Sequence, residues 1–361
     1  HKFACRHCED DMVRPDLPAD ANDKSLATTD VHARVAVSKY LDHNPLYRQE
    51  AIFSREGIIL KRQTLCGWMT RHAHNLQPIV DQMAKEMLSG AFIQSDDTGL
   101  KYLESPGPAN QGYMWSYVCG QMVVYDFATD RSRAGPTEFL SGFTGTLQVD
   151  GYAGYNQAVE KGSLTRAACW AHARRKFEYA LKTEEAMSAV ILLLIQKLYL
   201  VERDIRGQNP VLTPGQIVVV RKNRSLPVIA KLKKYLLECR QAVLPKSPLG
   251  KAIEYAFGQW EWLETYIHNG LVDIDNNSCE RSMRKVAIGR KNYMFAGSET
   301  GGHTAAVFYS LLETCSRLGI NAQEYLADIM VRVNTHPQSR IEELTPHGWK
   351  ATRESEVELS A

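Results

Sequence analysis

The spacing of apolar residues changes at Gly90 from a helical to a strand-like period, and it changes back near His172. Between these points, short stretches rich in aromatic and β-branched residues are separated by turn residues, which is typical of strands. The first three are joined by tight turns, and helix and strand then alternate, which predicts a mixed five-stranded sheet. The predicted strands are 91–97, 113–119, 122–128, 146–149 and 165–170, with short helices at 136–143 and 152–159.

Helical spacing dominates the remaining sequence. After the sheet it predicts helices at 177–181, 187–203, 226–240 and 251–268, a loop at 209–215, and further helices at 304–317 and 322–333. The predicted fold is therefore α/β: a ribonuclease-H-like core with an all-helical insertion, preceded by a helical region. The predicted parts are a linker region (1–30), the helical region (31–89), the first part of the core (90–171), the insertion (172–272), the last part of the core (273–335) and a polar tail (336–361).

The helical region has a helix-turn-helix pattern. A helix is predicted at 31–41, and after Pro45 a second helical segment ends at Arg55. Glu56 and Gly57 break the pattern, and a helix at 61–71 then places Leu65 and Trp68 inward. The second helix of such a motif can lie in a DNA major groove, although any small helical hairpin gives a similar pattern. A longer helix then continues to Gly90. The outward residues that would contact DNA include Lys61 and Arg62.

Three acidic residues fall at the ends of predicted elements. Asp96 lies in the first strand, Asp150 ends the fourth strand and Glu280 opens a later helix. The first and fourth strands are neighbours in such a sheet, so the two aspartates converge at one edge. Asp97 is a rival to Asp96, because alternation sends the two side chains to opposite faces. Taken singly, the aspartates also fit ordinary turns, and Asn277 with Glu280 fits a helix capping box.

Converging carboxylates repel one another, and a divalent cation removes the conflict. Hard oxygen ligands suit Mg²⁺ or Mn²⁺. Two such ions roughly 3.5 to 4 Å apart support in-line displacement at phosphorus, which predicts phosphodiester hydrolysis or strand transfer. Basic residues cluster near the acids and would meet DNA phosphates, although solvated helix surfaces look the same. They are Arg174, Arg175, Lys176, Arg281, Arg284, Arg290 and Lys291.

Cys5 and Cys8 have the spacing of half a zinc site. A second cysteine pair lost upstream, His7 or His32 could complete the zinc site, or Cys5 and Cys8 are plain thiols. The chain begins at His1, which suggests a missing N-terminal piece. His172, near Cys169, is expected to be structural. The net charge of +2 neither requires nor excludes a nucleic acid partner. Without a secretory signal or an apolar run of about 18 residues, a reduced cytoplasm is expected and a membrane partner is not.

Several longer motifs occur in an order that resembles the transposase of the bacterial insertion sequence 66 family. They are Lys-Tyr-Leu-Asp-His-Asn-Pro-Leu-Tyr-Arg-Gln-Glu at 39–50, Cys-Trp-Ala-His-Ala-Arg-Arg-Lys-Phe at 169–177, Asp-Asn-Asn at 275–277 with Glu280, and Ile-Gly-Arg-Lys-Asn at 288–292. The resemblance implies a DDE transposase with Asp96, Asp150 and Glu280 as its acids. The Asp-Glu-Thr motif of that family falls on 96–98, which selects Asp96, although Asp97 replaces the glutamate.

The expected function is cleavage of the ends of an insertion sequence and joining of the freed 3′-hydroxyl to target DNA, with Mg²⁺ or Mn²⁺ as cofactor. Double-stranded DNA, further copies of the chain in a dimer or larger complex, and small accessory proteins of the same element are the expected partners, in the bacterial nucleoid. Two alternatives remain: a catalytically inactive DNA-binding protein derived from a transposase, and a metal-dependent nuclease without strand transfer. The upstream cysteine pair of the family is absent, which leaves zinc binding by Cys5 and Cys8 open.

Overall fold

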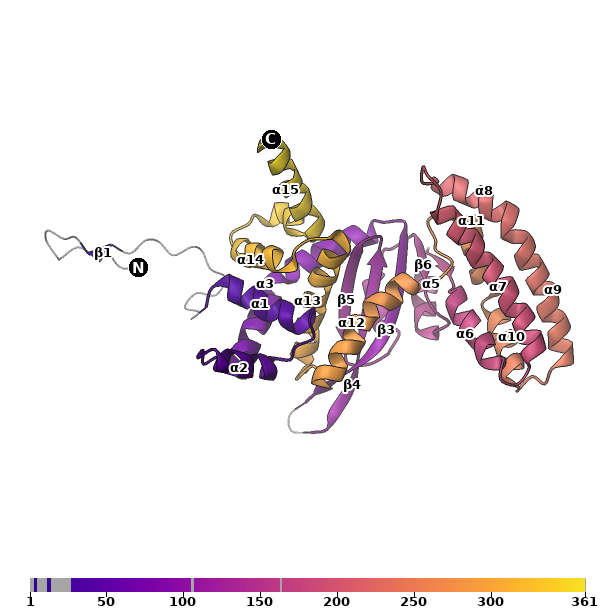
Figure 1. The fold of residues 1–361 in the computed structure, drawn as a ribbon, viewed down its shortest axis with the longest axis horizontal. Helices are drawn as coiled ribbons and strands as arrows, with labels where there is room; N and C mark the ends of the chain where they lie inside the picture. Colours follow the sequence, from indigo (N-terminus) through magenta and orange to yellow (C-terminus); the bar gives the residue numbers. More distant parts are fainter. Residues whose placement is uncertain (1–2, 5–11, 14–26, 105–106, 163, 361) are drawn as a thin grey trace. The chain divides into compact units, whose positions relative to one another are not determined.

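The structure is a computed structural model that describes residues 3–4, 12–13, 27–104, 107–162 and 164–360 (Figure 1). The chain divides into two compact units. The first comprises His1–Ala84, Tyr102–Ala109 and Ile288–Ala361, and the second Lys85–Lys101 and Asn110–Ala287. Among the described residues, none of the helices combines the length and the hydropathy of a membrane span.

A mixed five-stranded sheet forms the centre of the second unit, as the sequence predicts. The strand order is β5-β4-β3-β6-β7; β4 and β5 are antiparallel, whereas β6 runs parallel to both β3 and β7. The five strands are β3 (Phe92–Leu103), β4 (Ala109–Cys119), β5 (Met122–Ala128), β6 (Thr146–Gln148) and β7 (Thr165–Ala167). Separately, two-residue strands β1 (Phe3–Ala4) and β2 (Met12–Val13) pair with each other.

The first strand is longer than predicted. β3 continues through Asp97, Thr98 and Gly99 to Leu103, so the interpretation of this segment as a turn is wrong. β6 pairs with β3 only over Phe92–Gln94, so beyond these residues β4 is the neighbouring strand that can bind the amide and carbonyl groups of β3. The acidic pair therefore lies within a strand, where neighbouring side chains point to opposite faces.

The two faces of the sheet carry different helices. On one face Tyr117 stacks on Phe139 of α4 (Ala134–Phe139), with ring centroids 3.6 Å apart. On the other, Ser116 Oγ lies 2.8 Å from the Cys279 sulfur of α12 (Asn277–Tyr293). The predicted helix at 152–159 is a short 3-10 turn, η1 (Ala153–Tyr155), followed by α5 (Asn156–Lys161).

A helical region follows β7 around an apolar core that includes Trp170, Phe177 and Ile195 (Figure 1). The sequence missed α8, whose start is marked by a capping box between Thr213 and Gln216. It also predicted one helix where α10 and α11 are separate. The helices are α6 (Trp170–Ala180), α7 (Glu185–Arg206), α8 (Pro214–Arg224), α9 (Leu226–Ala242), α10 (Pro248–Gly258) and α11 (Trp260–His268).

The first unit is helical. Leu65 and Trp68 are buried, as their spacing predicts, but the two helices expected between residues 61 and 90 are one continuous α3. The predicted polar tail is also structured, because Leu344 and Trp349 bury their side chains. The elements are α1 (Thr29–Tyr40), α2 (Leu46–Arg55), α3 (Arg62–Leu88), α13 (Glu299–Leu318), α14 (Ala322–Arg332), η2 (Gln338–Leu344) and α15 (Pro346–Ser360).

Candidate active site

The register of two parallel strands brings Asp96 and Asp150 to equivalent positions. Phe92 pairs with Thr146 and Gln94 pairs with Gln148, and each aspartate lies two residues beyond that last pair. Side chains two residues apart share a face, and neighbouring strands are about 4.8 Å apart. Asp96 and Asp150 therefore extend from the same edge, on the face that carries the two glutamines.

Two buried glutamines behind the aspartates hold the segment that leads to α12. Gln94 Nε2 donates to Gln148 Oε1 at 2.8 Å and to the Asp275 carbonyl at 3.0 Å. Gln148 Nε2 donates to the Asp273 carbonyl at 2.7 Å. Sequence reasoning missed this pair, although a signal exists: both acidic strands contain Gln-x-Asp.

The start of α12 is fixed to the same strand. Asn276 Nδ2 donates to the Ser95 carbonyl at 2.9 Å, and the Asp275 carboxylate accepts the backbone N–H of Asn277 at 3.1 Å. Asp275 therefore accepts the first backbone N–H of α12. Because α12 begins at Asn277, Asn277 is a helical residue and not the N-cap of the suggested capping box. The Glu280 side chain is left to face α6.

Glu280 contacts two residues of α6. Its Oε2 lies 3.3 Å from an Arg175 guanidinium nitrogen, and its Oε1 lies 3.6 Å from His172 Nδ1, which is too long for a hydrogen bond. Both Glu280 Oε1 and His172 Nδ1 are buried without a hydrogen-bond partner among the described residues. His172, expected to be structural, therefore lies at the site with an unused ring nitrogen.

Cys169, His172 and Glu280 also bring one ligand atom each within 4.8 Å of one another, the one such group of three among the described residues. The three predicted acids thus do not form a single tight shell in this arrangement. Burial raises the pKa of the Cys169 thiol to about 12, and this sulfur accepts the Asn276 N–H.

The three acids interact electrostatically. The pKa of Asp96 is raised from 3.8 to about 7. Burial is the main cause, the charges of Asp150, Asp97 and Glu280 act in the same direction, and a hydrogen bond from the Asp97 N–H opposes them. This is the pattern of carboxylates that need a cation to be ionised together. The atoms offered are hard oxygens, which fit Mg²⁺ or Mn²⁺.

Asp97 points to the opposite face of β3, where it is already paired. Arg131 donates to both of its carboxylate oxygens, at 2.9 and 2.8 Å. The Arg131 guanidinium also lies 4.1 Å from the ring centroid of Tyr152. Ser95, on the same face, lies 3.0 Å from the Tyr155 hydroxyl. Strand alternation thus separates Asp96 from its rival.

The raised pKa of Asp96 predicts a stability effect without metal. Between pH 4 and 7 the folded protein holds a proton on Asp96 that the unfolded chain has lost, so this side chain makes stability fall as pH rises. An Asp96→Asn variant should therefore be more stable than the wild type at pH 8 by about 4 kcal/mol, and this gain should shrink toward pH 4. Urea unfolding with EDTA measures it; an equal gain at pH 4 and pH 8 would contradict the assignment.

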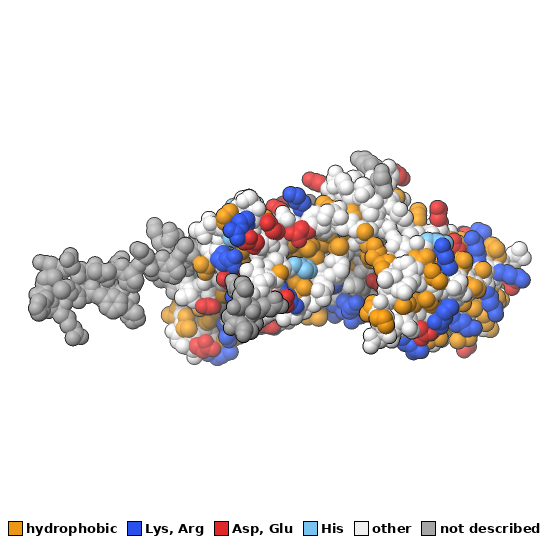
Figure 2. Space-filling model, turned by 90° about the horizontal axis from the view of Figure 1, so that it is seen from above, with side chains coloured by type: hydrophobic (Ala, Val, Ile, Leu, Met, Phe, Trp, Pro, Cys, Tyr) orange, Lys and Arg blue, Asp and Glu red, His pale blue; other side chains and the backbone are white. Residues whose placement is uncertain are grey.

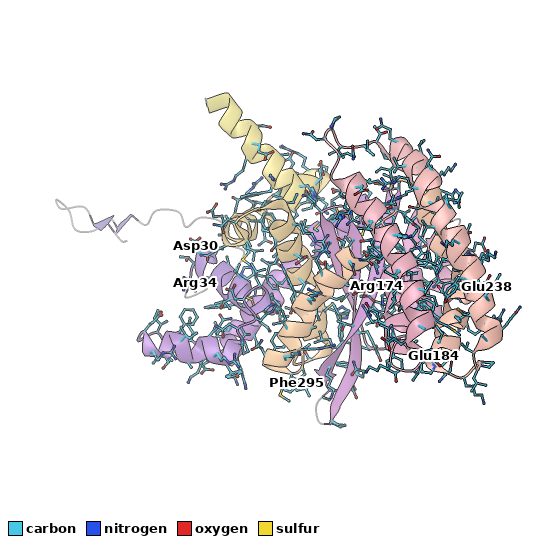
Figure 3. The ribbon with its side chains drawn as sticks, turned by 45° about the vertical axis from the view of Figure 1, so that its right-hand side comes forward. Asp30, Arg34, Arg174, Glu184, Glu238 and Phe295 are labelled. Carbon is cyan, nitrogen blue, oxygen red and sulfur yellow. The ribbon has the colours of Figure 1, made fainter. Side chains whose placement is uncertain are left out.

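The basic residues after β7 take different directions. Arg175 pairs with Glu280, and Lys176 lies over the Tyr255 ring at 4.3 Å from its centroid. Arg174, labelled in Figure 3, pairs with Glu178 at 2.9 Å instead. Figure 2 shows further Lys and Arg side chains gathered over the helical region. Two members of the predicted cluster therefore border the acids.

The other predicted DNA contacts lie on helix surfaces. On α12, Arg281, Arg284 and Lys291 are exposed and Arg290 is half-buried. In the first unit, Lys61 is exposed 3.7 Å from Glu50, whose carboxylate also accepts the backbone N–H of Arg62.

The predicted zinc ligands cannot be placed, because Cys5, His7 and Cys8 lie outside the described residues. His32 is described, and it is fully buried with Nδ1 2.9 Å from His72 Nε2. A histidine in this position is engaged in the packing of α1 against α3.

Comparison with known proteins identifies relatives along the whole chain. The family model described as Transposase IS66 family matches residues 24–304, and the IS66 C-terminal element matches residues 310–347. The uncharacterized protein y4jD of Sinorhizobium fredii is 36% identical, over 97% of this chain and 71% of the relative. Two further proteins of that organism, y4qI and y4hP, are 33% and 31% identical over 67% and 69% of their lengths. The first match includes all three acids.

Proposed function

The chain belongs to the transposase IS66 family, and on that premise we propose that it is a DDE transposase acting on double-stranded DNA. In this proposal Asp96, Asp150 and Glu280 are the metal-binding acids. The observation that carries it is the shared register of β3 and β6, with the glutamine pair behind the aspartates holding the segment that leads to Glu280. This arrangement supports a site that three acids distant in the chain form at one edge of the sheet.

We also propose that the sheet is a ribonuclease-H-like core, which the strand order and the mixture of parallel and antiparallel pairs support. Residues 172–272 would be its helical insertion. Residues 31–89 would bind specific DNA, which the exposed start of α3 after the α2 turn supports. Copies of the chain would assemble on paired DNA ends.

The residues present fit a divalent cation, because Glu280 Oε1 is buried without a partner and Asp96 is surrounded by like charges. When bound, Mg²⁺ or Mn²⁺ would supply activation of the attacking oxygen and neutralisation of charge on the phosphate. Arg175 and Lys176 would hold phosphate oxygens beside the acids. His172 Nδ1 would accept a proton or a hydrogen bond at this edge.

Cleavage of a duplex that carries an element end, with Mg²⁺ or with EDTA, tests the proposal. We expect a Mg²⁺-dependent nick that leaves a 3′-hydroxyl, followed by joining of that strand to plasmid DNA. Cleavage without joining would favour a nuclease. Binding of the duplex with neither cleavage nor joining would favour an inactive DNA-binding protein derived from a transposase.

A further inference from the structure

A cavity of about 460 Å³ lies between α6 and the start of α10, within the unit that contains the three acids. Its α6 residues recur at spacings of three and four, so they share one helix face. Its α10 residues belong to the first turns of that helix. The lining residues are His172, Arg175, Lys176 and Tyr179 from α6, and Pro248, Lys251 and Ala252 from α10.

The charges around this cavity favour an anion. Arg175, Lys176 and Lys251 contribute three cations, and its lining contains no carboxylate. The backbone N–H groups at the start of α10 add a partial positive charge; Ser247 Oγ accepts one of them, from Gly250, at 3.1 Å. A phosphate group fits this lining.

The cavity also offers a flat apolar surface and adjoins the acids. Tyr179 is 65% exposed, and the Lys182 ammonium lies 5.7 Å from its ring centroid, so the ring offers an exposed surface for stacking beside a further cation. His172 and Arg175 contact Glu280, while Lys176 lies over Tyr255. Tyr255 in turn packs against Gly151, where an added Cβ would lie 2.8 Å from its ring. One side of the cavity thus borders Glu280 and another borders the residue after Asp150.

We infer that this cavity binds one unpaired nucleotide of the DNA strand that the acids cut, an inference that rests on the proposed function. Its volume lies within the roughly 300 to 1,000 Å³ of pockets for single small ligands, and a duplex does not fit. Arg175, Lys176 and Lys251 would bind the phosphate, and the base would stack on Tyr179. Stacking of an unpaired base on an aromatic side chain tolerates any base, because every base has a π-face.

Binding of two probes tests this inference in the Asp150→Asn protein, so that no probe is cut: a short blunt duplex, and the same duplex with a few unpaired thymidines at one end. Fluorescence anisotropy should show about tenfold tighter binding of the tailed probe, and a tail without bases should lose that advantage. Tyr179→Ala should abolish the preference, whereas Tyr179→Phe should retain it. Leu193→Ala, an exposed apolar residue outside the cavity, is the matched control and should change nothing.

Charge is tested separately. Lys251→Ala should weaken binding of the tailed probe and reduce the slope of log binding constant against log salt concentration by about one. Lys234→Ala on α9 is the control and should leave the preference for the tailed probe unchanged. Equal binding of both probes, or a preference that survives Tyr179→Ala, would overturn the inference. Because binding is measured without cleavage, a wild-type protein that cuts DNA but ignores the tail refutes only this inference. A tail preference without any cleavage would refute only the proposed function.

Discussion

An Asp150→Asn variant is expected to lose Mg²⁺-dependent cleavage of the element end by about a thousandfold or more, while it still binds the same duplex. The amide keeps the size of the side chain but removes the charge that a divalent cation requires. Asp150 lies two residues beyond Gln148 as Asp96 lies two residues beyond Gln94, so loss of either carboxylate should disable the same site. Single-turnover cleavage and a binding measurement on the same probe separate the two effects.

The matched control is Asp97→Asn, because it makes the same chemical change next to Asp96. Its side chain faces Arg131 on the other side of β3, so a folded Asp97→Asn variant should keep cleavage within about tenfold of the wild type. Circular dichroism checks the fold of both variants. Wild-type rates in Asp150→Asn would refute the assignment of Asp150. Loss in Asp97→Asn together with retention in Asp96→Asn would move the site to the opposite face.

The sequence predicted the sheet because its strands carry strong local signals. Val123, Val124 and Tyr125, for example, are β-branched or aromatic residues that follow a turn at Gly120. The proximity of Asp96 and Asp150 follows from the predicted strand order, in which β3 and β6 are neighbours. The role of Gln94 and Gln148 does not, because their partners are backbone carbonyls of Asp273 and Asp275, far along the chain.

His172 shows why the rest of the site was harder to predict. The sequence placed Trp170 in a strand, but α6 begins at that residue. This start makes His172 helical and puts it on the same face as Arg175, Lys176 and Tyr179. The residue at which a helix begins depends on contacts with distant parts of the chain, which the local sequence does not show. Here the Trp170 ring N–H donates to the Leu263 carbonyl at 2.9 Å. Because the start of α6 was predicted a few residues too late, the place of His172 beside Glu280 was not predicted.

The largest expected loss of stability comes from Arg221→Met in the helical region. Arg221 donates to both carboxylate oxygens of Glu202, at 2.8 and 2.7 Å, and both side chains are buried. Its remaining donor group binds three backbone carbonyls, those of Tyr266, Asn269 and Val272. Removing the guanidinium leaves a buried carboxylate and three carbonyls without this donor, which should lower the free energy of unfolding by about 3–5 kcal/mol.

The matched control for Arg221→Met is Arg224→Met, three residues further along α8. Arg224 also forms an ion pair, 2.7 Å from Asp204, but both side chains are about half exposed. Its loss should cost less than about 1 kcal/mol in urea unfolding, because water replaces the partner. A cost for Arg221→Met no greater than that of Arg224→Met would show that the buried pair does not stabilise the region.

Arg221→Met should also affect the proposed catalytic acids. Val272 is the last residue whose carbonyl Arg221 binds. The carbonyls of the residues that follow, Asp273 and Asp275, are bound by Gln148 and Gln94 before α12 begins. Loss of Arg221 therefore frees one end of the segment that positions Glu280, so cleavage should fall even where the variant remains folded. Adding Glu202→Leu removes the unpaired charge and should recover part of the stability, but not the carbonyl contacts. Recovered stability with cleavage still impaired would assign the loss to the segment, whereas parallel recovery of both would assign it to the buried charge alone.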